Sequence, residues 1–149
     1  MTSDEMIEIA LDDRFVVNGR IESKKNIIIR CGIKANYGIE AGWGIEAGCG
    51  IEAGCGIEAG WGIEAGCGIE AGCGIEAGEG IEAGCGIEAG EGIEAGAFIS
   101  AKKRIFAGIS VYRTSKDCDK TIRCTELRDG EVCYGDLILT GSEEKPDED

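Results

Sequence analysis

The chain of 149 residues has no histidine, a single proline, and only two Trp, three Tyr and three Phe. So few aromatic residues, beside 26 glycines, argue against a conventional packed core. The sequence is nevertheless too periodic to read as a disordered chain, and its length allows one domain of ordinary size. We therefore expect a repeat architecture.

The sequence also has no run of about 18 apolar residues, and its first five residues lack the basic start of a signal peptide. Nine cysteines, an odd number, exclude a fully paired disulfide framework within one chain, whereas reduced thiols suit a cytoplasm. We expect a soluble cytoplasmic protein that does not bind a membrane.

Positive charge is missing from the centre of the chain. Twelve glutamates and no Lys, Arg or Asp lie between Ala35 and Ala101, and the net charge is -14. Nucleic acids and anionic membranes are themselves negatively charged, so we expect no direct binding to nucleic acid and favour a basic protein as partner. Basic residues bracket this zone at positions 20–34 and 102–104, where they read as solvated ends.

Isoleucine recurs every six residues from Ile39 to Ile93, each time followed by Glu and Ala, and a weaker form of the hexad extends the pattern over residues 15–110. Because six is even, strand alternation places every Ile and Ala on one face and every Glu on the other. We expect Ile and Ala to line the interior, and the Gly-X-Gly after each strand to turn a corner through positive φ.

The variable residue X indicates how many strands form one coil. Columns of X taken 12 residues apart are chemically mixed, whereas columns taken 18 apart group like residues. The columns at 18 are Cys31, Cys49, Cys67, Cys85; Tyr37, Cys55, Cys73, Glu91; and Trp43, Trp61, Glu79, Ala97. We therefore predict an all-β, triangular β-solenoid with 18-residue coils of three hexads, about five coils long.

The segments outside the hexads are expected to cover the ends of the solenoid. Residues 1–14 carry a capping box of Thr2 with Glu5 and predict a short helical cap. In residues 111–140, alternating segments around Arg128-Asp129-Gly130 predict a β-hairpin that caps the last coil or pairs two protomers as a homodimer. Residues 141–149 form an acidic tail that we expect to be disordered.

A coil of three hexads such as Ile39-Glu40-Ala41-Gly42-Trp43-Gly44 resembles the left-handed β-helix of hexapeptide-repeat acyltransferases. The chain matches the first two positions of that motif and departs at the fifth, where Trp43, Trp61, Glu79 and Glu91 are not small. Those enzymes use a histidine as general base, which this chain lacks, so the resemblance implies the architecture alone. We expect no catalytic activity, no catalytic residues and no cofactor.

The long run of Gly-Ile-Glu-Ala-Gly, with an ending such as Arg104-Ile105-Phe106-Ala107-Gly108, is also similar to short proteins of phages and bacterial mobile elements. This resemblance implies a phage protein acting in the cytoplasm of a bacterial host. Small acidic proteins of that kind resemble inhibitors of host defence, including CRISPR inhibitors and other DNA mimics.

The repeat glutamates are the main candidate partner-binding residues. At a spacing of 18 they form three ladders, to which Glu79 and Glu91 add charge: Glu40, Glu58, Glu76, Glu94; Glu46, Glu64, Glu82; and Glu52, Glu70, Glu88. Twelve charges over about 18 Å of axis give about one per 1.5 Å, against about one per 1.7 Å in duplex DNA. The alternative is that Glu only keeps a glycine-rich rod soluble.

Trp43 and Trp61 are the other candidate partner-binding residues, with a purely structural stack as the alternative. The cysteines read as corner side chains, and we expect no metal site because the repeat offers neither His nor Cys-x-x-Cys. A second hypothesis for the whole chain is a rigid assembly module whose ends drive oligomerisation.

Overall fold

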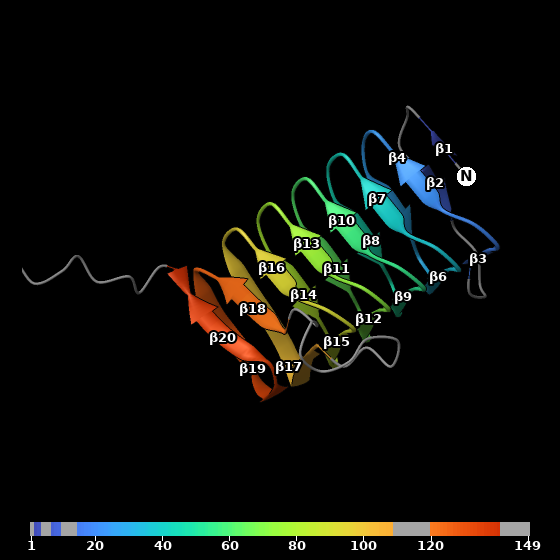
Figure 1. Ribbon diagram of the computed structural model, residues 1–149. Coiled ribbons are helices and arrows are strands. Elements are labelled where there is room, and N and C mark those ends of the chain that lie inside the picture. The colour runs from blue at the N-terminus through green and yellow to red at the C-terminus, as the bar shows by residue number, and fades with distance from the viewer. Residues whose placement is uncertain (1, 4–6, 10–14, 109–119, 141–149) are drawn as a thin grey trace, which may run out of the picture.

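The computed structural model describes residues 2–3, 7–9, 15–108 and 120–140, and every regular element in them is a β-strand. The strands stack in parallel as coils along one axis, so the described residues form a β-solenoid (Figure 1). No described residue belongs to a helix that is long and apolar enough to cross a membrane.

The solenoid has three faces, which we name after one strand of each. The β7 face contains β1 (Thr2–Ser3), β4 (Ile21–Ser23), β7 (Ile39–Ala41), β10 (Ile57–Ala59), β13 (Ile75–Ala77), β16 (Ile93–Ala95), β18 (Thr121–Cys124) and β20 (Asp136–Leu139). The β8 face contains β2 (Ile7–Ile9), β5 (Ile27–Ile29), β8 (Ile45–Ala47), β11 (Ile63–Ala65), β14 (Ile81–Ala83) and the first part of β17 (Phe98–Ala107). The β9 face contains β3 (Phe15–Val17), β6 (Ile33–Ala35), β9 (Ile51–Ala53), β12 (Ile69–Ala71), β15 (Ile87–Ala89) and the second part of β17. Strand β19 (Glu126–Tyr134) follows β17 around the corner between the last two faces.

The register confirms the predicted coil. Ile57 pairs with Ile39 on one side and with Ile75 on the other, so equivalent residues lie 18 positions apart. The same spacing holds on the β8 and β9 faces. The solenoid is longer than the predicted five coils, because eight strands stack on the β7 face and seven intervals of about 4.8 Å span about 34 Å.

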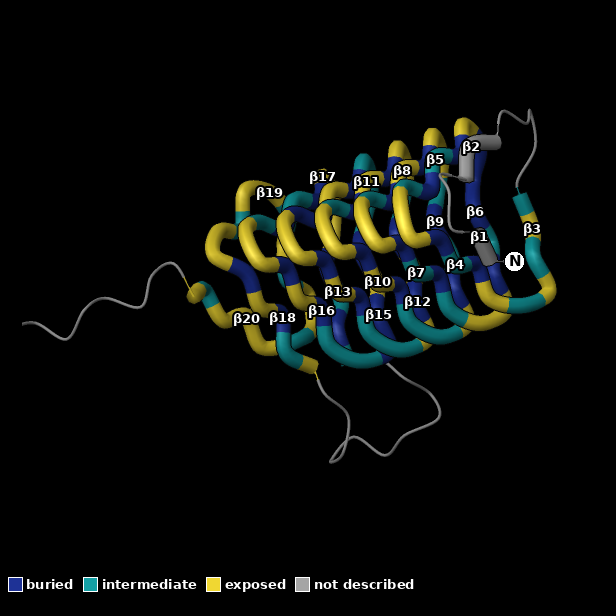
Figure 2. Tube along the Cα trace, turned by 90° about the horizontal axis from the view of Figure 1, so that it is seen from above, coloured by how far each residue is buried: buried dark blue, intermediate teal, exposed yellow. Residues whose placement is uncertain are grey.

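The core consists of the Ile and Ala of each hexad, as the alternation predicts. Ile63 is 1% exposed and Ala65 3% exposed, whereas Glu64 between them faces solvent. Figure 2 shows buried strand positions between more exposed corners all along the rod. Each coil stabilises the structure mainly by stacking its apolar residues on those of the next coil.

Contrary to the prediction from the sequence, the repeat glycines do not turn the corners through positive φ. Positive φ occurs, among the described residues, only at Gly108, Gly130 and Gly135, so no glycine between the repeat strands needs it. The glycine after Ala is required by close approach instead, because a Cβ on Gly60 would lie 2.1 Å from the carbonyl oxygen of Gly42. The glycine before Ile is less crowded, since a Cβ on Gly62 would lie 3.5 Å from its nearest neighbour.

The predicted N-terminal helix is wrong where the structure describes it. Thr2–Ser3 and Ile7–Ile9 are strands, and Ile7 and Ile9 align with Ile27 and Ile29 of the next coil. Isoleucines two residues apart suit the two-residue period of a strand. These strands add one more coil to the N-terminal end, and it pairs in parallel with the coil that contains Ile27 and Ile29. The rest of residues 1–14 lies outside the described residues.

The strands predicted within residues 120–140 exist, but their pairing as a hairpin is wrong. Strand β18 pairs in parallel with β16 and β20, and β19 pairs in parallel with β17. Gly130 of the predicted turn lies inside β19, where Leu127 and Val132 align with Ile99 and Ile105 of the coil before. Apolar alternation is the same in a hairpin and in a solenoid, so it does not reveal the partner strand. Residues 111–119 and the predicted disordered tail, 141–149, lie outside the described residues.

Candidate binding surface of three glutamate ladders

The repeat glutamates form the three predicted ladders. Glu58 aligns with Glu40 and Glu76 in strand register, and Glu64 aligns with Glu46 and Glu82. The β7 ladder is Glu40, Glu58, Glu76 and Glu94; the β8 ladder is Glu46, Glu64 and Glu82; the β9 ladder is Glu52, Glu70 and Glu88. Neighbouring carboxylates in each ladder project from backbones about 4.8 Å apart.

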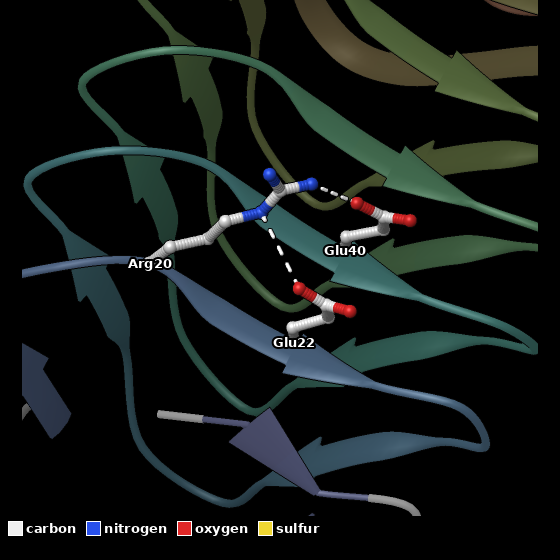
Figure 3. Close-up of polar contacts among 3 residues, drawn as sticks. All are labelled: Arg20, Glu22 and Glu40. Atoms are coloured by element: carbon white, nitrogen blue, oxygen red, sulfur yellow. Dashed lines mark hydrogen bonds and ion pairs between the residues drawn. The ribbon is translucent and has the colours of Figure 1, made fainter.

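Cations at the ends of two ladders pair with the first or last glutamate. Arg20 forms an ion pair with Glu40 and lies 3.9 Å from Glu22, as Figure 3 shows. At the other end of this face Arg123 lies 4.0 Å from Glu94. On the β9 face the Lys34 Nζ lies 2.9 Å from a Glu52 oxygen. Exposed pairs of this kind contribute about 0–1 kcal/mol each, so they neutralise charge more than they stabilise the fold.

The β8 ladder has a different setting. Its neighbours in register are Ile28 at one end and Ser100 at the other, and no described Lys or Arg pairs with it. Glu46, Glu64 and Glu82 are all exposed. Among the described residues, no ion pair offsets the charge of this ladder.

The corner columns are confirmed. The backbone N–H of Cys67 donates to the carbonyl of Cys49 at 3.1 Å, and that of Trp61 donates to the carbonyl of Trp43 at 2.9 Å. The two indole rings stack at 5.3 Å between centroids and 6° between planes. Trp43 is 41% and Trp61 53% exposed, so solvent reaches part of both stacked indoles.

The cysteines differ widely in environment. Cys49, Cys67 and Cys133 are exposed, whereas Cys31 and Cys124 are buried. Burial raises the pKa of the Cys124 thiol, which keeps it protonated and unreactive at neutral pH. Within the described residues, no three His, Cys, Asp or Glu side chains come together as a metal site would require.

A groove runs beside each ladder, between the glutamates and the neighbouring corner column. The groove on the β7 face has a volume of about 670 Å³ and is lined in part by Arg20 and Arg123. The groove on the β9 face, of about 1120 Å³, is lined in part by Lys102, Lys103 and Arg104. The groove on the β8 face, of about 280 Å³, has Trp61 in its wall and no Lys or Arg among its described lining residues.

The basic residues read from the sequence as solvated ends are therefore placed on particular faces. The 18-residue spacing is enough to predict one of these contacts, because Lys34 lies one coil before Glu52. The spacing cannot predict the contact of Arg123 with Glu94, because the hexad phase is lost before Arg123.

Comparison with known proteins finds no match to a protein family, a curated protein or a solved structure.

Repulsion within the ladders predicts that salt stabilises the protein. Glu64→Gln removes the central charge of the β8 ladder and should raise the free energy of unfolding by about 0.5 kcal/mol at 10 mM salt. The gain should vanish near 1 M salt, where the Debye length falls from about 30 Å to about 3 Å. Urea unfolding at both salt concentrations measures this difference. A stability gain that is independent of salt would contradict the electrostatic explanation.

Proposed function

We propose that this protein is a non-enzymatic inhibitor that mimics the charge of duplex DNA and occupies the nucleic-acid groove of a basic host protein. The observation that carries the proposal is the regular array of exposed and half-exposed carboxylates, held in register over the length of the repeat. Twelve carboxylates over about 18 Å of axis give about one charge per 1.5 Å, and about one per 2 Å when the ion-paired Glu40, Glu52 and Glu94 are left out, against about one per 1.7 Å for duplex DNA.

The rigidity of the array supports this proposal. Each glutamate projects from a strand whose neighbouring Ile and Ala are buried, so the spacing of the carboxylates is set by the backbone ladder. A groove lined with Lys and Arg would meet these charges without first ordering them, which lowers the entropic cost of association. The resemblance to phage proteins suggests a nuclease or CRISPR complex of a bacterial defence system as the target.

The experiment is capture of proteins from a bacterial lysate on the immobilised protein, followed by competition with duplex DNA and by salt steps. We expect the retained proteins to be nucleic-acid-binding proteins that duplex DNA displaces and that salt releases steeply. A matched variant carries Glu58→Gln, Glu64→Gln and Glu70→Gln, one change in each ladder. The proposal is wrong if this variant retains the same proteins with the same resistance to salt.

A second candidate, an assembly module, is favoured by the C-terminal end of the solenoid. Leu137 aligns with the fully buried Ile122 and therefore points inward, yet it is 38% exposed because no described strand lies over it. Leu127, Val132 and Leu139 beside it are only partly buried. This apolar end would stack on the same end of a second copy. Sedimentation velocity at high protein concentration tests the idea, and a monomer there would exclude it.

A further inference from the structure

The β8 face differs from the other two faces in both charge and aromatic content. Its groove is lined by carboxylates of the β8 ladder and by Trp61, without a described Lys or Arg. The grooves of the other faces already contain the chain's own cations. A cationic partner would have to displace those cations there, whereas the cation described beside the β8 groove, Arg128 over Phe98, lies at its C-terminal end and leaves the stretch around Trp61 open.

Carboxylates line the same groove as the exposed Trp61 indole on this face. Glu79 follows Trp61 directly in the corner column, where its backbone N–H donates to the Trp61 carbonyl at 2.8 Å. Glu64 lies three residues after Trp61 on β11 and lines the same groove. No described cation lies over either indole ring, although Lys25 precedes Trp43 in the column.

At the C-terminal end of this groove, an aromatic ring and a carboxylate already bind an arginine of the chain. Phe98, which lines the groove, carries the guanidinium of Arg128 over its ring at 3.8 Å. The Nε of the same Arg128 donates to a Glu126 oxygen at 3.2 Å. An aromatic ring and a carboxylate thus bind one guanidinium within the molecule itself, and Trp61 with Glu64 and Glu79 offers the same kinds of groups, with no described cation over the indole.

We propose that the β8 face is the docking surface, and that an arginine of the partner stacks on Trp61 while Glu64 and Glu79 accept its N–H groups. The inference rests on the proposed function, since it selects one of the three ladders and names the partner's chemistry. Arginine fits better than lysine, because its planar guanidinium stacks on an indole and donates a fork of hydrogen bonds to carboxylates.

The test uses nona-arginine and nona-lysine peptides as probes, with titration calorimetry at low salt and the fluorescence of the chain's two tryptophans as readouts. We expect nona-arginine to bind about fivefold more tightly than nona-lysine and to change the tryptophan fluorescence. Trp61→Ala should remove this preference for arginine. Trp61 is 53% exposed, so the fold should tolerate the change, which circular dichroism verifies.

Two variants with equal loss of charge compare the faces. Glu64→Gln with Glu82→Gln changes the β8 ladder and should weaken nona-arginine binding about tenfold, whereas Glu58→Gln with Glu76→Gln on the β7 ladder should weaken it less than about threefold. The choice of the β8 face would be overturned if the two double variants weakened binding equally and Trp61→Ala kept the preference for arginine. The proposal that the protein binds polycations would still stand in that case. Failure of the unchanged protein to bind either peptide would contradict the proposed function itself.

Discussion

Gly60→Ala is expected to lower the free energy of unfolding by about 3 kcal/mol or more, although it adds only one methyl group. The methyl carbon would lie 2.1 Å from the carbonyl oxygen of Gly42 and 3.0 Å from its carbonyl carbon. Both atoms belong to the backbone, and Gly60 N–H already donates to the carbonyl of Ala41 at 3.0 Å. Relief therefore requires the two coils to move apart at this corner, which weakens the hydrogen bonds between them.

Gly62→Ala is the matched control, two residues later in the same coil. Its methyl carbon would meet its nearest neighbour, the carbonyl oxygen of Gly80, at 3.5 Å, an ordinary contact. Because φ is not positive there, we expect a change of less than about 1 kcal/mol. Urea unfolding followed by far-ultraviolet circular dichroism measures both variants. Equal effects of the two substitutions would show that the coils do not approach each other as closely as described.

Ile63→Ala is expected to cost about 3 kcal/mol of stability. Ile63 is 1% exposed and aligns with Ile45 and Ile81 in the coils on either side, so truncation leaves a cavity within the stack. Closing that cavity would need neighbouring coils to shift, and the unbroken backbone ladder opposes such a shift. The loss should appear in the midpoint of urea or thermal unfolding.

Ile63→Val provides the graded comparison, since removal of one methylene group should cost about 1 kcal/mol. Glu64, the outward-facing neighbour of Ile63, provides a second comparison. Glu64→Gln should leave the free energy of unfolding unchanged or raise it slightly. This order of effects follows from which face of β11 each residue occupies. If Ile63→Ala and Glu64→Gln had similar effects, the assignment of the interior would be wrong.

These stability tests also bear on function. A partner that reads a nucleic-acid backbone requires charges at constant spacing, and that spacing depends on the stack of isoleucines inside the rod. A variant with a loosened core should therefore bind a polycation less tightly even though every glutamate is kept. The two Gln variants of the ladders test charge without disturbing that stack.

Much of the fold could be predicted from the repeat, because its period is even and its variable residue recurs at 18. The even period decides that Ile63 is inside and Glu64 outside in every coil, and the column of Trp43 with Trp61 decides that three strands form one coil. The same register aligns Glu46, Glu64 and Glu82 as a ladder, so the composition of each candidate ladder also follows from the sequence.

Only the tertiary structure decided what lies outside the exact repeat. The alternation in residues 120–140 suits any strand partner, and parallel pairing with β16 and β17 became evident only when these strands were placed on the last coil. Arg123 comes beside Glu94 through that pairing, at a separation that no periodicity encodes. Position in the hexad therefore determined which residues are exposed, whereas contacts between distant segments, such as Arg123 with Glu94, determined which glutamates at the C-terminal end form ion pairs.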